Sequence, residues 1–405
     1  MSGMNFLEKL LEGAAVEWKA LGDVAEYSPT RIDAAELNAT SFVGVDNLVA
    51  NKGGRVDANY LPNTDRLTAY ESGDILLGNI RPYLKKVWKA TNSGGCSGDV
   101  LAVRILDKCK KFVSAEFLYY LLSSDNFFSY NMQHAKGAKM PRGNKAAILN
   151  YQIPIPCPDN PDRSLAIQSK IVRILDTFTE LTTELTTELT LRQKQYEYYR
   201  DRLLTFEEGE VEWKTLGDVA NFSNGKGHEK DIVEDGKYLV VNSKFISTDG
   251  RVAKFSNTQI FPLFKDDILL VMSDLPNGKA LSKTFIVDAN DRYTLNQRIG
   301  GITVKNKEEI LPRFLYYFLN RTPQLLKYDS GVDQTNLRKD QILGVKIPIL
   351  SLVEQAHIVA ILDTFDTLTT SISEGLPREI ALRQKQYEYY RDLLLSFPKA
   401  EEDEK

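Results

Sequence analysis

Five short segments gather the side chains best suited to specific polar recognition. Most combine Arg, Lys, Asn or Gln with Gly, Pro or Ser residues typical of turns; they are Asn79–Lys86, Lys136–Lys145, Met272–Lys283, Asn296–Arg298 and Ser330–Lys339. An arginine can form two parallel hydrogen bonds to guanine, and an asparagine or glutamine can do the same to adenine, whereas lysines and backbone N–H groups bind phosphates. The chemistry that these segments predict is therefore binding to nucleic acid.

The candidate DNA-binding residues lie at matching places in the two halves of the chain. A single loop of this kind is more often a solvated turn, but matching loops in both halves favour DNA contact. In the first half the candidates are Arg81, Tyr83, Lys85, Lys86, Lys136, Lys139, Arg142, Asn144 and Lys145. In the second half they are Ser273, Asn277, Lys279, Lys283, Asn296, Gln297, Arg298, Gln334, Asn336, Arg338 and Lys339.

The charge of the chain is unevenly distributed. The formal net charge is −4, with 51 Lys and Arg against 55 Asp and Glu, which by itself argues against nucleic acid. Residues 25–152, however, carry 16 basic and 12 acidic side chains, and residues 220–346 carry 19 and 15, so each segment is +4. Two mildly basic segments on an acidic remainder would turn positive charge toward phosphates, although surface lysines are common on any protein.

Motifs for catalysis are missing. The sequence contains no GxxxxGK[ST] phosphate loop, no Asn/Asp-Pro-Pro-aromatic methyltransferase loop, no GxSxG and no HExxH. Glu17–Lys19 and Glu212–Lys214 (Glu-Trp-Lys) could end a metal-dependent nuclease motif, but a tryptophan at a domain junction between solvated charges is the simpler interpretation. His134 has no carboxylate or cysteine beside it for acid–base work. We expect no catalytic residues.

Cysteine and histidine usage excludes further classes of site. Cys96, Cys109 and Cys157 are odd in number and far apart, which argues against disulfides and favours a reducing cytoplasm. Three histidines and no CxxC pair nearly exclude a zinc site, so we predict no metal. No stretch approaches the roughly 18 apolar residues of a membrane span, and the first residues lack a signal peptide. We expect a cytoplasmic protein without membrane contact.

An internal duplication organises the chain. Val16–Val24 (VEWKALGDV) matches Val211–Val219 (VEWKTLGDV), and Leu191–Asp201 is identical to Leu382–Asp392 (LRQKQYEYYRD). Four shorter pairs follow in the same order: GDILL and DDILL, FLYYLL and FLYYFL, IPIP and IPIL, and ILDTF twice. The repeated motifs at the ends of the two copies are nearly identical, while the residues between them differ. This predicts one platform that presents two different binding surfaces.

Each copy is predicted to contain a small α+β domain and a long helix. Short β-branched and aromatic runs between turn residues predict strands at Ser41–Val45, Asp74–Ile80, Val100–Ile105, Tyr238–Val241, Ile268–Met272 and Ile299–Val304. Each FLYY run predicts a helix packed on these strands. The predicted parts are an N-terminal segment that completes a circular repeat (1–24), a first α+β domain (25–152), a central region with a long helix (153–210), a second α+β domain (211–346) and a C-terminal region with a long helix (347–405).

The two long helices are predicted to pack on each other. After Pro161, apolar residues recur at steps of three and four over about 40 residues, as in a coiled coil, which would be on the order of 60 Å long. Because both apolar stripes match, an antiparallel pair with a pseudo-twofold axis is favoured. Gly375 and Pro377 predict a kink in the second helix. Phe6–Leu11 precedes VEWK as Asp201–Phe206 does, so it is expected to imitate the end of the first helix.

The layout resembles the specificity subunit of type I restriction–modification systems over essentially the whole chain. The matching features are the duplicated VEWK-x-LGDV, IPIP before a long helix, ILDTF, and RQKQYEYYRD at the end of each helix. Thr179–Thr190 (TELTTELTTELT) resembles the tandem TAEL-like units of one subfamily, and Gly375–Lys399 is similar to its tail. The resemblance implies that helix length sets a DNA spacer, and one such unit would add ~6 Å of helix. Sequence slippage with no role is the alternative.

In this family, the loop that ends each domain often has the pattern G-x-x-Q-x-N-L-x-K. The second copy fits this pattern at Gly331, Gln334, Asn336, Leu337 and Lys339. The first copy keeps Gly137 and Lys145 but has Met140, Arg142 and Gly143 in place of Gln, Asn and Leu. The role of Arg142 is therefore expected to differ from that of Asn336.

The resemblance implies a non-catalytic subunit with two target-recognition domains. Each domain would read one half of an asymmetric, bipartite sequence in double-stranded DNA. The helices would set the spacer and dock two modification (adenine methyltransferase) subunits, with restriction subunits joining them. The chain itself would hold no cofactor; S-adenosylmethionine, Mg and ATP are expected only on partner subunits. From the residues alone, a stand-alone metal-dependent nuclease and a coiled-coil adaptor without a DNA role stay open.

Overall fold

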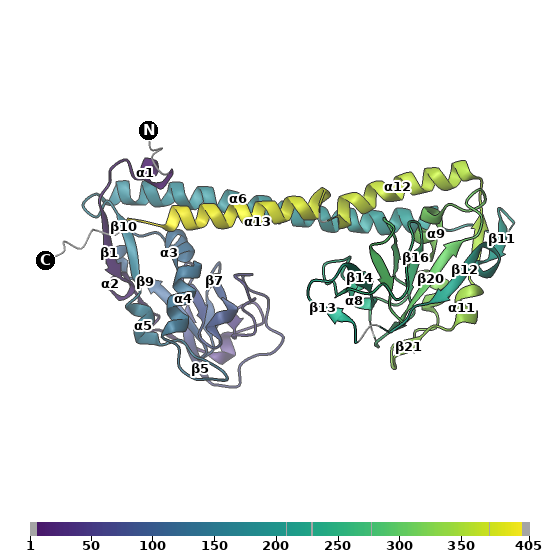
Figure 1. The fold of residues 1–405 in the computed structure, drawn as a ribbon. Helices are drawn as coiled ribbons and strands as arrows, with labels where there is room; N and C mark the ends of the chain where they lie inside the picture. Colours follow the sequence, from purple (N-terminus) through teal and green to yellow (C-terminus); the bar gives the residue numbers. More distant parts are fainter. Residues whose placement is uncertain (1–5, 208, 228–229, 277, 372, 399–405) are drawn as a thin grey trace. The chain divides into compact units, whose positions relative to one another are not determined.

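The structure is a computed structural model that describes residues 6–207, 209–227, 230–276, 278–371 and 373–398 (Figure 1). The chain divides into two compact units. Unit 1 contains Met1–Glu184 and Ala381–Lys405, and unit 2 contains Leu185–Ile380. Each unit thus combines one α+β domain with parts of both helical regions.

The α+β domain of unit 1 contains two four-stranded sheets. One is antiparallel, with the order β2 (Ala25–Tyr27), β9 (Val100–Ile105), β6 (Ile75–Gly78) and β7 (Val87–Lys89). The other is mixed, with the order β3 (Arg31–Asp33), β5 (Arg66–Tyr70), β8 (Gly94–Cys96) and β4 (Phe42–Val43). Helical segments complete the unit: α1 (Phe6–Leu11), α2 (Leu21–Val24), η1 (Ala34–Glu36), η2 (Pro82–Leu84), η3 (Asp107–Cys109), α3 (Ala115–Leu122), α4 (Asp125–Gln133) and α5 (Lys145–Leu149).

Unit 2 repeats this plan. Its antiparallel sheet has the order β12 (Ala220–Asn224), β20 (Ile299–Val304), β16 (Ile268–Val271) and β18 (Thr284–Ile286), and its mixed sheet has the order β13 (Ile232–Val233), β15 (Phe255–Ser256), β14 (Tyr238–Val241) and β19 (Tyr293–Leu295). Its short helices are α7 (Leu216–Val219), α8 (Ser243–Ser247), α9 (Pro312–Leu319), α10 (Pro323–Leu326) and α11 (Lys339–Leu343). Gly78 lies opposite Val100 in unit 1, and Val271 lies opposite Ile299 in unit 2. The shared register confirms the duplication and the α+β fold.

The predicted strands and helices are found close to their expected bounds. β9, β14 and β20 coincide with the predicted runs, and the other three begin or end within two residues of them. The FLYY runs form α3 and α9, whose Phe117 and Phe314 are fully buried. Alternation and buried apolar runs were therefore sufficient signals for these elements.

Within each copy, two of the repeated motifs pair with each other as strands. β1 (Val16–Ala20) lies antiparallel to β10 (Gln152–Pro156), so that Trp18 is opposite Pro154. β11 (Glu212–Thr215) lies antiparallel to β22 (Lys346–Ile349), so that Trp213 is opposite Pro348. The two charged residues of the first Glu-Trp-Lys motif form an ion pair with each other, Lys19 with Glu17 at 3.0 Å. Within the described residues no group of three His, Cys, Asp or Glu could hold a metal ion.

One long helix extends through both units, and a second helical region is interrupted. α6 (Pro161–Leu203) has 43 residues, as the apolar periodicity predicts. α12 (Leu352–Thr370) ends before α13 (Gly375–Leu395) begins, and Gly375 has φ +73°, which favours glycine. The kink predicted at Gly375 and Pro377 is therefore a break between two helices. Pro377 lies in the first turn of α13, where proline is tolerated.

The helices pack antiparallel within each unit. In unit 1, Phe178 of α6 stacks on Tyr390 of α13 with ring centroids 5.4 Å apart, while Ile167 shares a core with Leu394. In unit 2, Tyr199 of α6 stacks on Phe365 of α12 at 5.6 Å, while the later Leu203 packs with the earlier Ile358. In both units, residue numbers increase along α6 while those of the residues packed against it decrease, so the helices run in opposite directions. The antiparallel packing predicted from the two stripes is confirmed.

The C-terminal residues take the place expected for Phe6–Leu11. In unit 2, Phe206 at the end of α6 lies against Trp213, with ring centroids 6.5 Å apart. The corresponding residue in unit 1 is Phe397, which is buried against Phe117, and Trp18 Nε1 donates to the carbonyl of Pro398. Leu7 and Leu11 of α1 enter the same core as an additional element.

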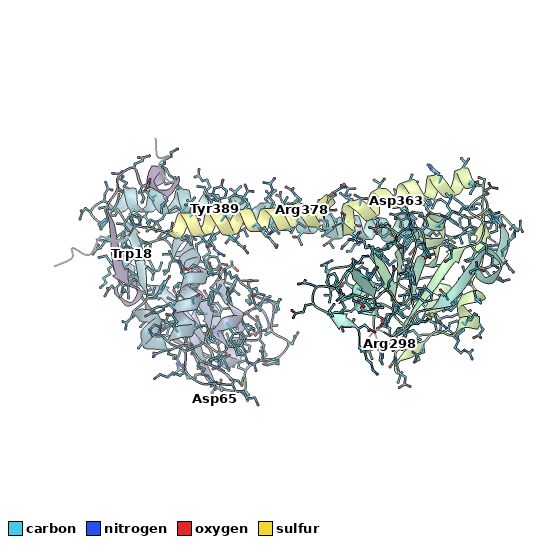
Figure 2. The ribbon with its side chains drawn as sticks, viewed as in Figure 1. Trp18, Asp65, Arg298, Asp363, Arg378 and Tyr389 are labelled. Atoms are coloured by element: carbon cyan, nitrogen blue, oxygen red, sulfur yellow. The ribbon has the colours of Figure 1, made fainter. Side chains whose placement is uncertain are left out.

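Two polar contacts fasten each α+β domain to its helix. The buried Gln168 accepts from Ser114 N and donates to the Phe112 carbonyl, at 2.9 and 2.6 Å. The equivalent Gln355 accepts from Leu311 N and donates to the Glu309 carbonyl. The second contact joins an FLYY tyrosine to the aspartate of ILDTF; in unit 2 this aspartate is Asp363, seen on α12 in Figure 2. The loops directly before α3 and α9 are thereby fixed to α6 and α12.

Candidate nucleic-acid interface

Two of the sequence-predicted loops of the first domain meet beyond the end of β6. Ile80 bridges Arg142, and the Arg81 N–H donates to the Pro141 carbonyl at 2.7 Å. Asn79 completes the contact: its carbonyl accepts from Gly143 N, and its N–H donates to the Asp99 carbonyl. We call these three adjoining segments (79–81, 99 and 141–143) the first loop crossing. It joins Asn79–Lys86 and Lys136–Lys145 into one surface.

The second domain has the same crossing at the equivalent place. β17 (Ser273–Asp274) pairs with β21 (Thr335–Asn336), so that Ser273 lies opposite Asn336. The Met272 carbonyl accepts from Leu337 N, and Met272 N donates to the Arg298 carbonyl at 3.3 Å. Segments 272–274, 298 and 335–337 form the second loop crossing. Since β6 and β16 are equivalent strands, the predicted loops converge beyond the same strand in both domains.

Several predicted residues of the first domain are exposed at or near the crossing. Arg81 has φ +53° and ψ +62°, a left-handed conformation rarely adopted by non-glycine residues and often associated with functional loops. Tyr83 is 49% exposed on the following turn. The other exposed candidates are Lys136, Lys139, Arg142 and Lys145, of which Lys145 begins helix α5.

Three predicted residues of the first domain are engaged inside the fold. Lys85 Nζ binds Asp125 Oδ1 at 2.6 Å, and Lys86 Nζ donates to the Val45 carbonyl at 2.7 Å. Asn144 caps helix α5, where its side-chain oxygen accepts from the backbone of Ala146 and Ala147. These contacts help to hold the loops in place.

The second domain presents a larger exposed set. Exposed candidates are Lys279, Gln297, Arg298, Gln334, Asn336, Arg338 and Lys339. Figure 2 shows Arg298 at the end of the domain far from Asp363. Gln334 Nε2 donates to Ser273 Oγ at 2.8 Å, which joins the two sides of the crossing. Asn296 is half-buried, and Lys283 pairs with Asp249 at 2.7 Å. Asn277 lies outside the described residues.

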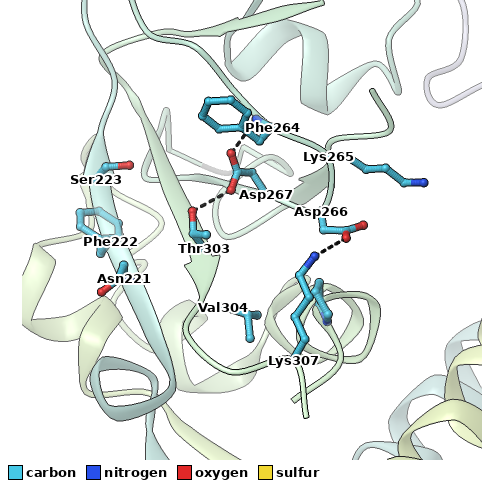
Figure 3. A pocket seen from close by; sticks show the side chains of 11 residues that line it. Asn221, Phe222, Ser223, Phe264, Lys265, Asp266, Asp267, Thr303, Val304 and Lys307 are labelled. Carbon is cyan, nitrogen blue, oxygen red and sulfur yellow. Dashed lines mark hydrogen bonds and ion pairs between the residues drawn. The ribbon is translucent and has the colours of Figure 1, made fainter. Parts of the chain in front are cut away.

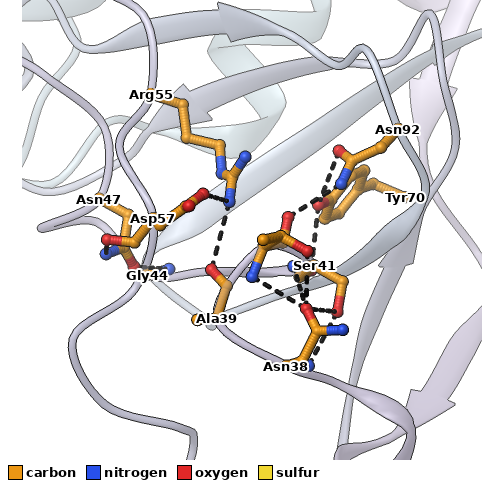
Figure 4. Close-up of polar contacts among 10 residues, drawn as sticks. Asn38, Ala39, Ser41, Gly44, Asn47, Arg55, Asp57, Tyr70 and Asn92 are labelled. Atoms are coloured by element: carbon orange, nitrogen blue, oxygen red, sulfur yellow. Dashed lines mark hydrogen bonds and ion pairs between the residues drawn. The ribbon is translucent and has the colours of Figure 1, made fainter.

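The segment between β4 and β5 adjoins the first crossing and was not among the sequence candidates. Figure 4 shows its polar network: Asn47 Oδ1 accepts from Gly44 N at 2.8 Å, and Arg55 donates to Asp57 and to the Ala39 carbonyl. A cavity of about 660 Å³ lies between this segment and Asp99. A long segment without regular structure is often functional. The length of this segment was the sequence feature that could have identified it as a candidate.

A second cavity lies away from the loop crossing of the second domain. It measures about 410 Å³ and lies beside Asp267, before the start of β16, whereas the crossing follows the end of that strand (Figure 3). The buried Asp267 accepts from Thr303 Oγ1 at 2.7 Å and from Phe264 N at 2.8 Å. Lys307 pairs with Asp266 at 2.6 Å. These polar groups satisfy one another, so the cavity adds no candidate site.

Comparisons with known proteins find the same duplication of the chain. The model of the family "type I restriction modification DNA specificity domain" matches residues 15–192 and again residues 208–382. The specificity subunit of the type I restriction enzyme EcoR124I/EcoR124II of Escherichia coli is 38% identical over 99% of both chains. The EcoprrI specificity subunit of the same organism is 28% identical over 92% of this chain and 93% of its own.

Solved structures show the same fold. A chain from a structure of type I restriction–modification complex assembly superposes with a TM-score of 0.58 at 18% identity, covering 94% of this chain and 97% of its own. The S subunit from M. genitalium gives a TM-score of 0.55 at 16% identity, covering 96% and 98%. In the described residues no helix is long and apolar enough to cross a membrane.

The chain belongs to the family of type I restriction–modification DNA specificity domains. It carries two such domains and aligns over nearly its whole length with a curated specificity subunit, so it is the specificity subunit of a type I restriction–modification system with two recognition domains.

Proposed function

We propose that each recognition domain reads one half of an asymmetric, bipartite sequence in double-stranded DNA through its loop crossing. The observation that carries this proposal is that both crossings have the same backbone pairing but different outward residues, Arg142 in one and Asn336 in the other. The net charge of +4 on residues 25–152 and on residues 220–346 suits approach to phosphates. The two domains would therefore grip one duplex and recognise different bases.

The helices set the separation of the two half-sites in this proposal. Gln168 of α6 holds the first domain, and Gln355 of α12 holds the second. Because α12 packs on α6, through Tyr199 and Phe365, a change in the length of α6 would be passed to the recognition loops. Within the tandem units, threonine hydroxyls bond to their own helix, as Thr183 does to the Thr179 carbonyl at 2.8 Å. Such units add length without requiring a partner of their own.

The repeated LRQKQYEYYRD segments are the proposed docks for two modification subunits. Their tyrosines divide by position: Tyr196 and Tyr387 are mostly buried, whereas Tyr198 and Tyr389 are 58% and 65% exposed. Leu191 and Leu382, seven residues earlier, are 56% and 42% exposed. Each unit thus shows the same outward Leu and Tyr pair, as expected for two copies of one partner. Restriction subunits would join this complex.

The chain supplies sequence recognition and no catalytic group in this proposal. Adenine methylation and DNA cleavage would be performed by the partner subunits, and S-adenosylmethionine, Mg and ATP would bind there. The complex would work in the cytoplasm.

Equilibrium binding tests the proposal. The sequence that the complex methylates is first identified. The full chain, reconstituted with its modification subunit, is then titrated, at several salt concentrations, with duplexes that carry or lack this sequence. We expect tight, salt-dependent binding that requires both half-sites. Equal binding to all duplexes would contradict sequence reading, and cleavage by the chain alone with Mg²⁺ would favour the nuclease alternative.

A further inference from the structure

Each loop crossing contains one arginine, and the two arginines come from different segments. Asp99 and Arg298 are equivalent, because their carbonyls accept from Asn79 N and Met272 N, the residues that follow β6 and β16. Arg142 and Asn336 are equivalent, because they bridge Ile80 and Ser273. The first domain therefore has Asp99 with Arg142, and the second has Arg298 with Asn336.

The guanidinium of Arg142 is held along one edge. Its Nε donates to Asp99 Oδ1 at 3.1 Å and one terminal nitrogen donates to Asp99 Oδ2 at 3.4 Å. Asp99 also raises the pKa of Arg142. The Arg142 side chain is 57% exposed, so the rest of the group faces outward. A guanidinium has five N–H donors, and two bonds to Asp99 leave three for a ligand.

The remaining donors match one base. Guanine presents two acceptors, O6 and N7, in the major groove, and a forked arginine can bind both at once. A carboxylate that fixes the guanidinium plane reduces the rotamer freedom that binding would otherwise remove. At the equivalent place in the second domain, Asn336 carries a carboxamide, which matches adenine.

We propose that Arg142 reads a guanine in the first half-site and that Asp99 is the residue that positions it. This inference rests on the proposed function. The inference also explains why Arg142 departs from the family pattern. At the same backbone position, an arginine would prefer guanine and an asparagine, such as Asn336, would prefer adenine.

An exposed ion pair contributes little to stability, so base preference is the informative measurement. The full chain with its modification subunit is assayed on DNA in which each position of the target is varied in turn. The variants are Arg142→Ala, Arg142→Lys and Asp99→Ala. Asp107→Ala is the matched control, because Asp107 forms another exposed ion pair, with Lys110 at 2.7 Å, in the same domain.

We expect Arg142→Ala to lose preference for guanine at one position of one half-site by roughly 5- to 150-fold. Arg142→Lys should lose the same preference while it keeps the salt dependence of binding, because a lysine retains the charge and cannot fork. Asp99→Ala should weaken preference at that position alone, and Asp107→Ala should change no position.

Three results would overturn parts of the account separately. Uniform weakening on all sequences by Arg142→Ala, with a shallower salt dependence, would make Arg142 a phosphate contact. An unchanged preference in Asp99→Ala would remove the positioning role of Asp99. If the unmodified complex prefers no sequence at all, the proposed function fails and not this inference alone.

Discussion

The hydroxyl of Tyr120 in helix α3 donates to Asp176 Oδ1 in helix α6 over 2.5 Å. The same bond, also 2.5 Å, joins Tyr317 of α9 to Asp363 of α12 in the other unit. Both partners belong to repeated motifs, FLYY and ILDTF. In both units, these motifs together attach a recognition domain to a helix.

Removing the Tyr120 hydroxyl should loosen this attachment. Tyr120 is 5% exposed, and a hydrogen bond to a charged group contributes about 1.5–3 kcal/mol. Tyr120→Phe should lower the free energy of unfolding by an amount in this range in urea titrations. Tyr389→Phe is the control, because Tyr389 is 65% exposed on α13 and should change little. Equal effects of both variants would argue against the tether.

Asp125 should make stability depend on pH. It accepts bonds from Lys52, Lys85 and Arg391. Partial burial acts to raise the pKa of Asp125, but hydrogen bonds from Lys85 and Lys52 outweigh it and hold the pKa below its ordinary value of 3.8. Such a carboxylate stabilises the fold above its unfolded-state pKa and loses this contribution as pH falls through its folded-state pKa.

The substitution Asp125→Asn should therefore destabilise the protein at pH 7. Its difference from the unmodified chain should shrink as pH falls below about 4. Unfolding in urea at several pH values measures this. Asp107→Asn, which removes a fully exposed partner of Lys110, should show a smaller difference at pH 7. A gap for Asp125→Asn that is independent of pH would contradict the assignment.

Deleting one tandem unit should shorten the DNA spacer. Removing residues 183–186 takes away ~6 Å of α6, which compares with 3.4 Å per base-pair step, so the preferred spacer should fall by about one or two base pairs. Methylation of targets with a graded series of spacers measures this. Thr183→Ala keeps the helix length and should keep the spacer. An unchanged optimum after the deletion would leave the units without a measuring role.

Residues on the two crossings should affect separate half-sites. Arg81→Ala should relax selectivity only in the half-site read by the first domain, and Asn336→Ala only in the other, at roughly 1–3 kcal/mol per base contact. Competition between targets altered in one half-site measures this. Relaxation in both half-sites by one substitution would show that the domains do not read independently.

Residues with an internal copy were the most predictable from sequence. The repeated motifs and apolar stripes identified α6, the FLYY helices and the central strands, because local periodicity determines such elements. The loops at equivalent places were also identified, and the structure joins them in pairs. Gln168 and Gln355 were missed, although a glutamine at the same place in both copies was a usable signal.

Long-range partners could not be predicted. Lys85 and Arg81 look alike in the sequence, yet Lys85 is bound to Asp125, some 40 residues away, and Arg81 stays exposed. The buried Arg391 joins the same aspartate from the end of the chain. Such ion pairs depend on how distant segments pack, which no local pattern records. Asp99 was missed for the same reason.

Mapping N6-methyladenine in DNA exposed to this chain and its modification subunit tests the central claim most directly. The account predicts methylation only within one asymmetric sequence made of two short specified parts separated by unspecified bases of constant number. Methylation spread over unrelated sequences, or confined to a single uninterrupted site, would contradict it.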